Sequence, residues 1–171
     1  SASTKSISRI TSLEFDHADI FDSVEDVEAA FALLIESVSA DGHVVVSKAA
    51  SRAFRLLTEL GFAGRVTSYS ASESDADYWA SDIDVGPEGT AFKLHHGTDA
   101  PEDVRVALWG KHSVENALAL FASLEAQGFS RASVADAMTT FPGVKKRLEL
   151  IGEAQGVAVV EDFGHHPTAV K

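Results

Sequence analysis

The amino-acid sequence predicts an α/β protein with a small antiparallel sheet, followed by the first strands of a second domain. Short apolar runs rich in valine alternate with stretches of helical periodicity across residues 10–69. Two strand-like runs then flank the turn-rich segment 97–101, which is typical of an antiparallel pair. After Pro142 and Gly143 the helical pattern stops and two further short strands follow.

The first half of the chain predicts alternating strands and helices. Residues 10–15 form the first expected strand. Ser23 is the expected N-cap of a helix whose apolar residues recur every three or four positions and which stops at residues 41–42. The next expected elements are strand 43–47, helix 48–60 ended by Gly61, and strand 65–69. This order is typical of a parallel α/β unit.

The second half predicts antiparallel strands and two helices. The acidic, serine-rich residues 70–84 predict a loop or an irregular sheet edge, and residues 86–89 predict a turn, so that a hairpin patch is appended to the α/β layer. The remaining expected elements are strands 90–95 and 104–108, a helix from Ser113 to Gly128, helix 133–140, and strands 147–151 and 157–160.

The composition excludes several classes of protein. The chain has 171 residues and a formal net charge of -12, so it should not bind nucleic acid through a general basic face. It has no cysteine, which excludes disulfides and thiol nucleophiles and fits a cytoplasmic location. Its apolar runs are far shorter than the roughly 20 residues of a membrane helix, and its first residues lack the apolar core of a secretory signal.

Residues 14–19, Glu-Phe-Asp-His-Ala-Asp, form the first polar cluster at the end of an apolar element. Carboxylates with one imidazole can hold Mg²⁺. The alternative is a helix-entry loop whose acids are solvated.

Residues 110–116, Gly-Lys-His-Ser-Val-Glu-Asn, form the second cluster, between a strand and a helix. Helix N-termini bind anions and present side chains to ligands. The Gly-Lys pair is not a P-loop, because Arg105 and His112 stand where that motif needs glycine and Ser/Thr. The alternative is a structural one, in which Ser113 caps the helix and Asn116 lies in its first turn.

The third cluster joins the basic residues 145–147 to Asp162, His165 and His166. The carboxyl end of a strand is where α/β sheets place ligand groups. A simple ion pair between Arg147 and the acid is the alternative, and a zinc site is disfavoured because adjacent histidines rarely converge on one metal.

Four segments, EFDHADIF, GKHSVENALAL, FPGVKKRLEL and EDFGHHPTA, occur in an order that resembles the Mur ligases from about residue 10 to the end. The first and last are most similar to the ligases that attach a murein tripeptide to UDP-N-acetylmuramate, and the ligases that attach L-alanine are the near neighbour. The resemblance implies that residues 1–143 are part of the central ATPase domain without its P-loop. Residues 144–171 would begin a Rossmann-like C-terminal domain. The 171 residues alone are therefore expected to be inactive.

The resemblance also implies ATP and Mg²⁺ as cofactors, with UDP-N-acetylmuramate and a murein tripeptide as the partners of the full-length protein. His17 would bind Mg²⁺, and Asn116 would read the adenine edge, with His112 in the same motif. The remaining implied contacts are Arg147 with ribose or phosphate, Asp162 with the ribose, and His165 with the phosphates. Ser113 departs from the family, which usually has asparagine there. Two other classes stay open: a non-catalytic nucleotide-binding fragment, and an unrelated metal-binding α/β domain.

Overall fold

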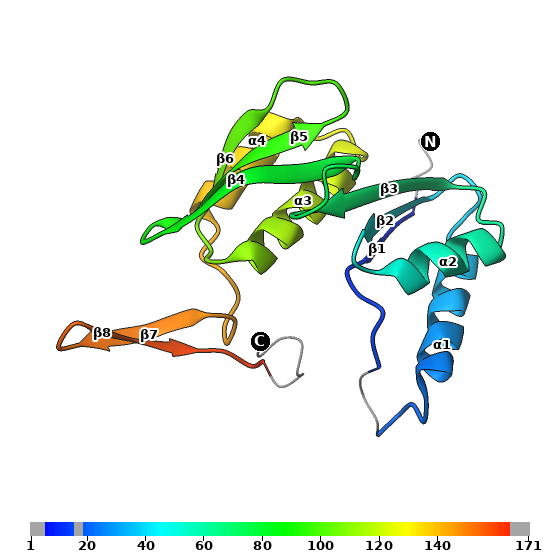
Figure 1. Ribbon diagram of the computed structural model, residues 1–171, viewed down its shortest axis with the longest axis horizontal. Coiled ribbons are helices and arrows are strands. Elements are labelled where there is room, and N and C mark those ends of the chain that lie inside the picture. The colour runs from blue at the N-terminus through cyan, green and yellow to red at the C-terminus, as the bar shows by residue number, and fades with distance from the viewer. Residues whose placement is uncertain (1–5, 16–18, 165–171) are drawn as a thin grey trace.

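The computed structural model describes residues 6–15 and 19–164, and its main body is one six-stranded sheet (Figure 1). The strands lie side by side in chain order. Pairing is parallel from the first strand to the fourth and antiparallel from the fourth to the sixth. The strands are β1 (Ile7–Ile10), β2 (His43–Ser47), β3 (Arg65–Ser70), β4 (Tyr78–Gly86), β5 (Gly89–His96) and β6 (Glu102–Val106). The predicted α/β fold class is confirmed.

The valine run of β2 is buried because helices cover both faces of the sheet. Val44 and Val46 pack in one cluster with α1 (Val24–Ser37) and α2 (Ser51–Glu59). Val45 packs in a second cluster with α3 (Lys111–Glu125) and α4 (Arg131–Thr140). Successive side chains of a strand point to opposite faces, so a run of three apolar residues marks a strand covered on both sides.

The predicted start of α1 is confirmed, because the hydroxyl of Ser23 accepts a hydrogen bond from the backbone N–H of Asp26. Helix α2 starts at Ser51, later than expected. The backbone N–H of Lys48 donates to the carbonyl of Tyr69 in β3, so this residue is bonded to the sheet and does not begin the helix. The helix is followed by Gly61 at φ +59°, as its predicted role as a stop requires.

The strand expected at residues 10–15 is misplaced, since β1 ends at Ile10. The end of the neighbouring strand β2 sets the end of β1. Ile10 pairs with Val46, and β2 itself ends one residue later at Ser47, so β2 offers no partner to a strand that continues to residue 15. Among residues 11–15 only Leu13 turns inward, with 5% of its surface exposed.

The loop or irregular sheet edge expected at residues 70–84 is wrong in its second part, where β4 forms a strand of nine residues inside the sheet. Tyr78 and Ala80 face the core. The acidic residues that made this segment resemble a loop lie near an irregularity in the pairing of β4 with β5, between Ser81 and Asp84. Asp82 there has φ +52°. Because β4 also pairs in parallel with β3, the antiparallel strands continue the main sheet and are not an appended patch.

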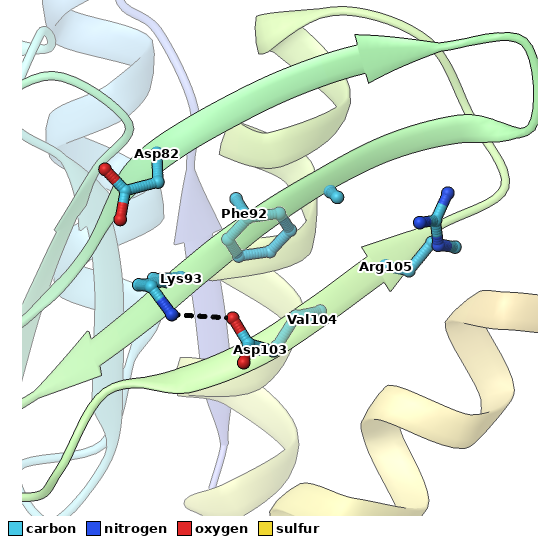
Figure 2. Close-up of a pocket in the computed structure, with 7 residues that line it drawn as sticks. Asp82, Phe92, Lys93, Asp103, Val104 and Arg105 are labelled. Atoms are coloured by element: carbon cyan, nitrogen blue, oxygen red, sulfur yellow. Dashed lines mark hydrogen bonds and ion pairs between the residues drawn. The ribbon is translucent and has the colours of Figure 1, made fainter.

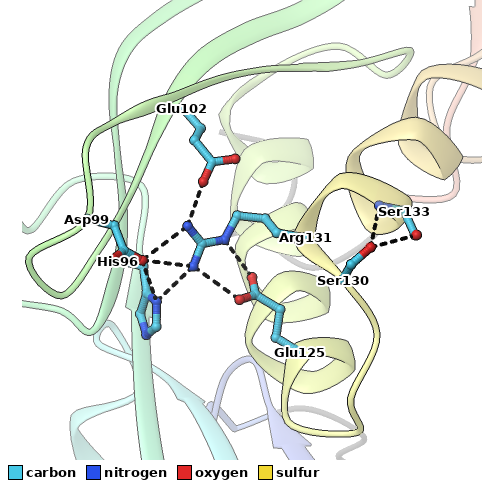
Figure 3. Close-up of polar contacts among 7 residues, drawn as sticks. All are labelled: His96, Asp99, Glu102, Glu125, Ser130, Arg131 and Ser133. Carbon is cyan, nitrogen blue, oxygen red and sulfur yellow. Dashed lines mark hydrogen bonds and ion pairs between the residues drawn. The ribbon is translucent and has the colours of Figure 1, made fainter.

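Helix α4 is anchored to the antiparallel strands by Arg131 (Figure 3). Its guanidinium donates to Glu125 at the end of α3 and to Glu102 at the start of β6, at 2.9 and 2.7 Å. It also lies 2.9 Å from Nδ1 of His96, whose ring stacks on Tyr78 at 4.0 Å. The helix starts at Arg131 after its N-cap Ser130, so the predicted start at residue 133 is two residues late.

Strands β7 (Glu149–Ala154) and β8 (Val157–Glu161) form a separate two-stranded hairpin. Gln155 and Gly156 connect them at φ +53° and +77°, as in a type I′ turn. The hairpin was predicted, but β7 starts two residues later than expected. Leu148 has φ +47°, which is incompatible with an extended strand.

Candidate functional site

Helix α3 begins at a glycine held by the neighbouring strand. The hydroxyl of Thr90 accepts from the N–H of Gly110 at 3.0 Å and donates to the carbonyl of Leu108 at 2.8 Å. Gly110 has φ +89°, a conformation that favours glycine, and it takes the N-cap position without a side-chain cap. Ser113, expected to be the cap, is instead buried and donates to the carbonyl of Trp109.

Replacing this glycine tests whether its backbone conformation sets the start of α3. Gly110→Ala should destabilise the chain by about 1–3 kcal/mol, the usual cost of forcing a side chain into a disfavoured φ region. An added Cβ would also lie 3.0 Å from the His112 ring. Urea unfolding measures the change. Gly152→Ala is the control, because Gly152 has no positive φ and an added Cβ there meets nothing within 4 Å. Equal stability of the two variants would contradict the prediction.

His112 and Asn116 both lie exposed on the first turns of α3. They are four residues apart, so their side chains share one face of the helix. An imidazole and an amide on one exposed face offer donors and acceptors to a planar polar ligand.

Glu115 turns the other way, toward the sheet. Its Oε1 accepts from the backbone N–H of Ala71, the residue after β3, at 2.8 Å. Its Oε2 is buried and has no hydrogen-bond partner among the described residues. Burial raises the pKa of this carboxyl above its ordinary value, although the Ala71 N–H and the Lys111 charge oppose the shift. Sequence reasoning missed this residue, because only the fold shows that it is half-buried.

Asp162 closes the turn that leads into the terminal hairpin. Its carboxylate oxygens accept from the backbone N–H groups of Leu148 and Gly164, at 2.9 and 2.6 Å. These bonds lower the pKa of Asp162, and the charges of Arg147 and His112 add to the effect. The carboxylate is therefore ionised at neutral pH and retains lone pairs for further donors.

The turn before the terminal hairpin joins two of the predicted site residues, because Arg147 precedes Leu148, whose backbone N–H donates to Asp162. The charges of Arg147 and His112 both lower the pKa of Asp162. The guanidinium carbon of Arg147 is also 6.0 Å from the ring centre of Phe163. His17 and His165, the other two predicted ligands of Mg²⁺ and phosphate, lie outside the described residues.

The carboxyl ends of the parallel strands carry a further cation that sequence reasoning did not single out. Lys48 follows β2 directly, and its Nζ lies 2.9 Å from a carboxylate oxygen of Asp75 in the loop after β3. In open α/β sheets this edge is where ligands bind. The signal in the sequence was its position, one residue beyond the valine strand.

The outer face of β5 and β6 carries a hollow with a different set of lining residues from those described above (Figure 2). Its charged lining includes Lys93 and Asp103, which pair with each other at 2.8 Å. His112, Asn116, Arg147 and Asp162, the predicted site residues that the structure describes, do not line it. Within residues 6–15 and 19–164, no three histidine or acidic side chains gather as a metal site would require.

The family model of the Mur ligase middle domain matches residues 4–124. The chain belongs to the Mur ligase family. Members of this family are ATP-dependent ligases of peptidoglycan synthesis. The match excludes the alternative of an unrelated metal-binding domain. It ends before residue 143, so the domain boundary expected there stays a prediction.

Relatives and solved Mur ligase structures cover nearly the whole chain. The UDP-N-acetylmuramate–L-alanine ligase of Solibacter usitatus is 32% identical over 165 residues, or 96% of this chain and 34% of that protein. MurF from Acinetobacter baumannii has a TM-score of 0.81 at 22% identity, covering 96% of this chain and 35% of that one. A murein peptide ligase from Psychrobacter arcticus has a TM-score of 0.68 at 26% identity, covering 96% and 33%. The chain thus spans about a third of the curated relative's length.

None of the helices in the described part of this Mur ligase chain has the length and apolar composition that crossing a membrane would need.

Proposed function

We propose that the chain is the adenine-reading part of an ATP-dependent Mur ligase that forms an amide on UDP-N-acetylmuramate in the cytoplasm. The observation that carries the proposal is the exposed face of α3 with His112 and Asn116, together with the turn before the terminal hairpin, which joins Arg147 to Asp162. An imidazole, an amide, a carboxylate and a guanidinium can together bind a base, a ribose and phosphate. These residue roles rest on the motif resemblance.

The proposed reaction has two steps. The muramate carboxylate attacks the terminal phosphorus of ATP, which gives an acyl phosphate and ADP. The amine of the acceptor then attacks the acyl carbon, phosphate leaves, and the amine loses a proton as the amide forms. Positioning and charge neutralisation are the main tasks of the protein in such a transfer. Arg147 supplies one cation, and Mg²⁺, with His17 as its proposed ligand, would supply further positive charge.

Two acceptors are candidates, and both present the amino group of an L-alanyl residue. The segments EFDHADIF and EDFGHHPTA favour a murein tripeptide that starts with L-alanine. The curated relatives at 30–33% identity are named for free L-alanine, which favours the second candidate. We propose the tripeptide as the acceptor and L-alanine as the alternative.

The full-length protein, supplied with ATP, Mg²⁺ and UDP-N-acetylmuramate, should release phosphate only when an acceptor is added. Phosphate release and mass spectrometry of the product measure the reaction. We expect a higher kcat/KM with L-alanyl-γ-D-glutamyl-meso-diaminopimelate than with L-alanine. A reversed preference would select the alternative acceptor. The absence of an amide product with either amine would overturn the proposed function.

A further inference from the structure

We propose that Glu115 is a positioning residue for the nucleotide site: its carboxyl fixes the loop after β3 to α3 and thereby sets the helix face that carries His112 and Asn116. The inference rests on the proposed function, because it assigns that helix face to a nucleotide. It adds a residue that the sequence motifs do not assign.

The loop after β3, residues 71–77, is fixed to three different elements. Asp75 pairs with Lys48 after β2 at 2.9 Å. Asp77 accepts from both the backbone N–H and the hydroxyl of Ser68 in β3, at 2.7 Å each. The third point is the bond from the Ala71 N–H to Glu115 Oε1, at 2.8 Å. It is the only hydrogen bond seen in the described residues between this loop and α3.

The placement of Glu115 on α3 makes this bond relevant to the exposed face. Glu115 precedes Asn116 and follows His112 by three residues, so all three lie within the first two turns. The helix N-terminus has no side-chain cap, and Thr90 holds Gly110 just before it, so the inward bond of Glu115 further limits how the first turns can shift. A shift of about 1 Å in a group that contacts a ligand can cost a large factor in function.

The surroundings of the carboxyl show a polar contact built into the core and not a solvated surface acid. Oε2 is buried without a partner among the described residues. Tyr69, two residues before Ala71, is nearby: burial raises the pKa of its hydroxyl to about 12, and the charge of Glu115 adds to that. A buried acceptor that holds one backbone N–H at such a cost is expected to serve geometry.

The test uses the full-length protein and three variants of Glu115 with a matched control. Glu115→Ala removes the bond, Glu115→Gln keeps an oxygen that can accept from Ala71, and Glu115→Asp shortens the reach. Glu73→Gln is the control, because it removes one negative charge from the exposed part of the same loop. The readouts are the KM for ATP, the KM for UDP-N-acetylmuramate, kcat, and amide hydrogen exchange at Ala71.

Glu115→Ala should raise the KM for ATP about tenfold, which corresponds to about 1.4 kcal/mol, and should change the KM for UDP-N-acetylmuramate less than about twofold. Exchange at Ala71 should become faster. Glu115→Gln should restore both properties to within about threefold of the wild type. Glu115→Asp should lie between them, and Glu73→Gln should match the wild type.

Burial also gives the wild type a pH dependence that the glutamine variant should lack. The folded-state pKa of Glu115 is raised, so its contribution to stability is full below the ordinary glutamate pKa and is lost as the pH rises through the folded value. Glu115→Gln should therefore gain stability relative to the wild type as the pH rises above the ordinary glutamate pKa. Urea unfolding at several pH values measures this difference.

The inference is overturned if Glu115→Ala leaves the KM for ATP and the Ala71 exchange unchanged. It is also overturned if both KM values and kcat worsen in parallel with a lower melting temperature, which indicates a role in folding alone. If the wild-type protein shows no ATP-dependent ligation, the proposed function fails separately. Exchange at Ala71 then still reports whether Glu115 holds the loop.

Discussion

Arg131→Ala should destabilise the chain by about 3 kcal/mol, one of the two largest effects that we expect. Only 16% of the Arg131 side chain is exposed, and it is bonded to acidic groups from α3 and from the start of β6. Removing the guanidinium leaves Glu125, 19% exposed, without its cation, and breaking a buried pair in this way costs about 3–5 kcal/mol. The lower end applies because Glu102 is half exposed. Urea unfolding followed by tryptophan fluorescence measures the loss.

The matched control is Arg105→Ala. Arg105 is exposed on β6 and reaches a single acid, Glu88, at 3.9 Å. An exposed pair of this kind contributes about 0–1 kcal/mol, so this variant should be nearly as stable as the wild type. Arg131→Lys should recover only part of the loss, because an ammonium cannot reproduce the forked guanidinium. The prediction fails if the two alanine variants unfold at the same urea concentration.

The sequence predicted the elements whose local chemistry and burial agree. The centre of β2 is a run of valines because helices cover both faces of the sheet, and each face needs apolar side chains. Ser23 has the N-cap role that its position before an acidic first turn indicates. Local propensity was sufficient at these places, because the tertiary structure demands the same residue types.

Other features depend on contacts that the sequence does not show. Residues 70–84 were expected to be a loop or an irregular sheet edge because they are acidic and rich in serine, yet pairing with β3 and β5 makes their second part a strand. Ser113 has the residue type of a cap, but the chain turns into α3 at Gly110 under the control of Thr90. The residues around Glu115 in the sequence do not distinguish it from a solvated surface acid, and the backbone N–H that it accepts from belongs to the distant Ala71. In each case a residue distant in sequence decides the outcome.

Asn116→Ala should weaken ATP binding by the full-length protein about tenfold to a hundredfold and leave the affinity for UDP-N-acetylmuramate within about twofold. The amide of Asn116 carries both a donor and an acceptor, which can match the complementary edge of adenine. Alanine leaves a group of the bound base unpaired, which costs about 1–3 kcal/mol. Because Asn116 is exposed, its loss should not disturb the core. Equilibrium binding of ATP and of UDP-N-acetylmuramate measures both effects.

A selective loss separates a reading role from a structural one. If Asn116 reads the base, the variant should also discriminate less between ATP and GTP, because the two bases differ at the edge that an amide can distinguish. Leu120→Ala is the control: Leu120 lies one turn further along α3 and is 36% exposed, so its loss tests the helix without removing a polar group. It should leave both affinities and the ATP preference unchanged. Equal losses of both affinities in Asn116→Ala would instead indicate a structural role for this residue and contradict the prediction.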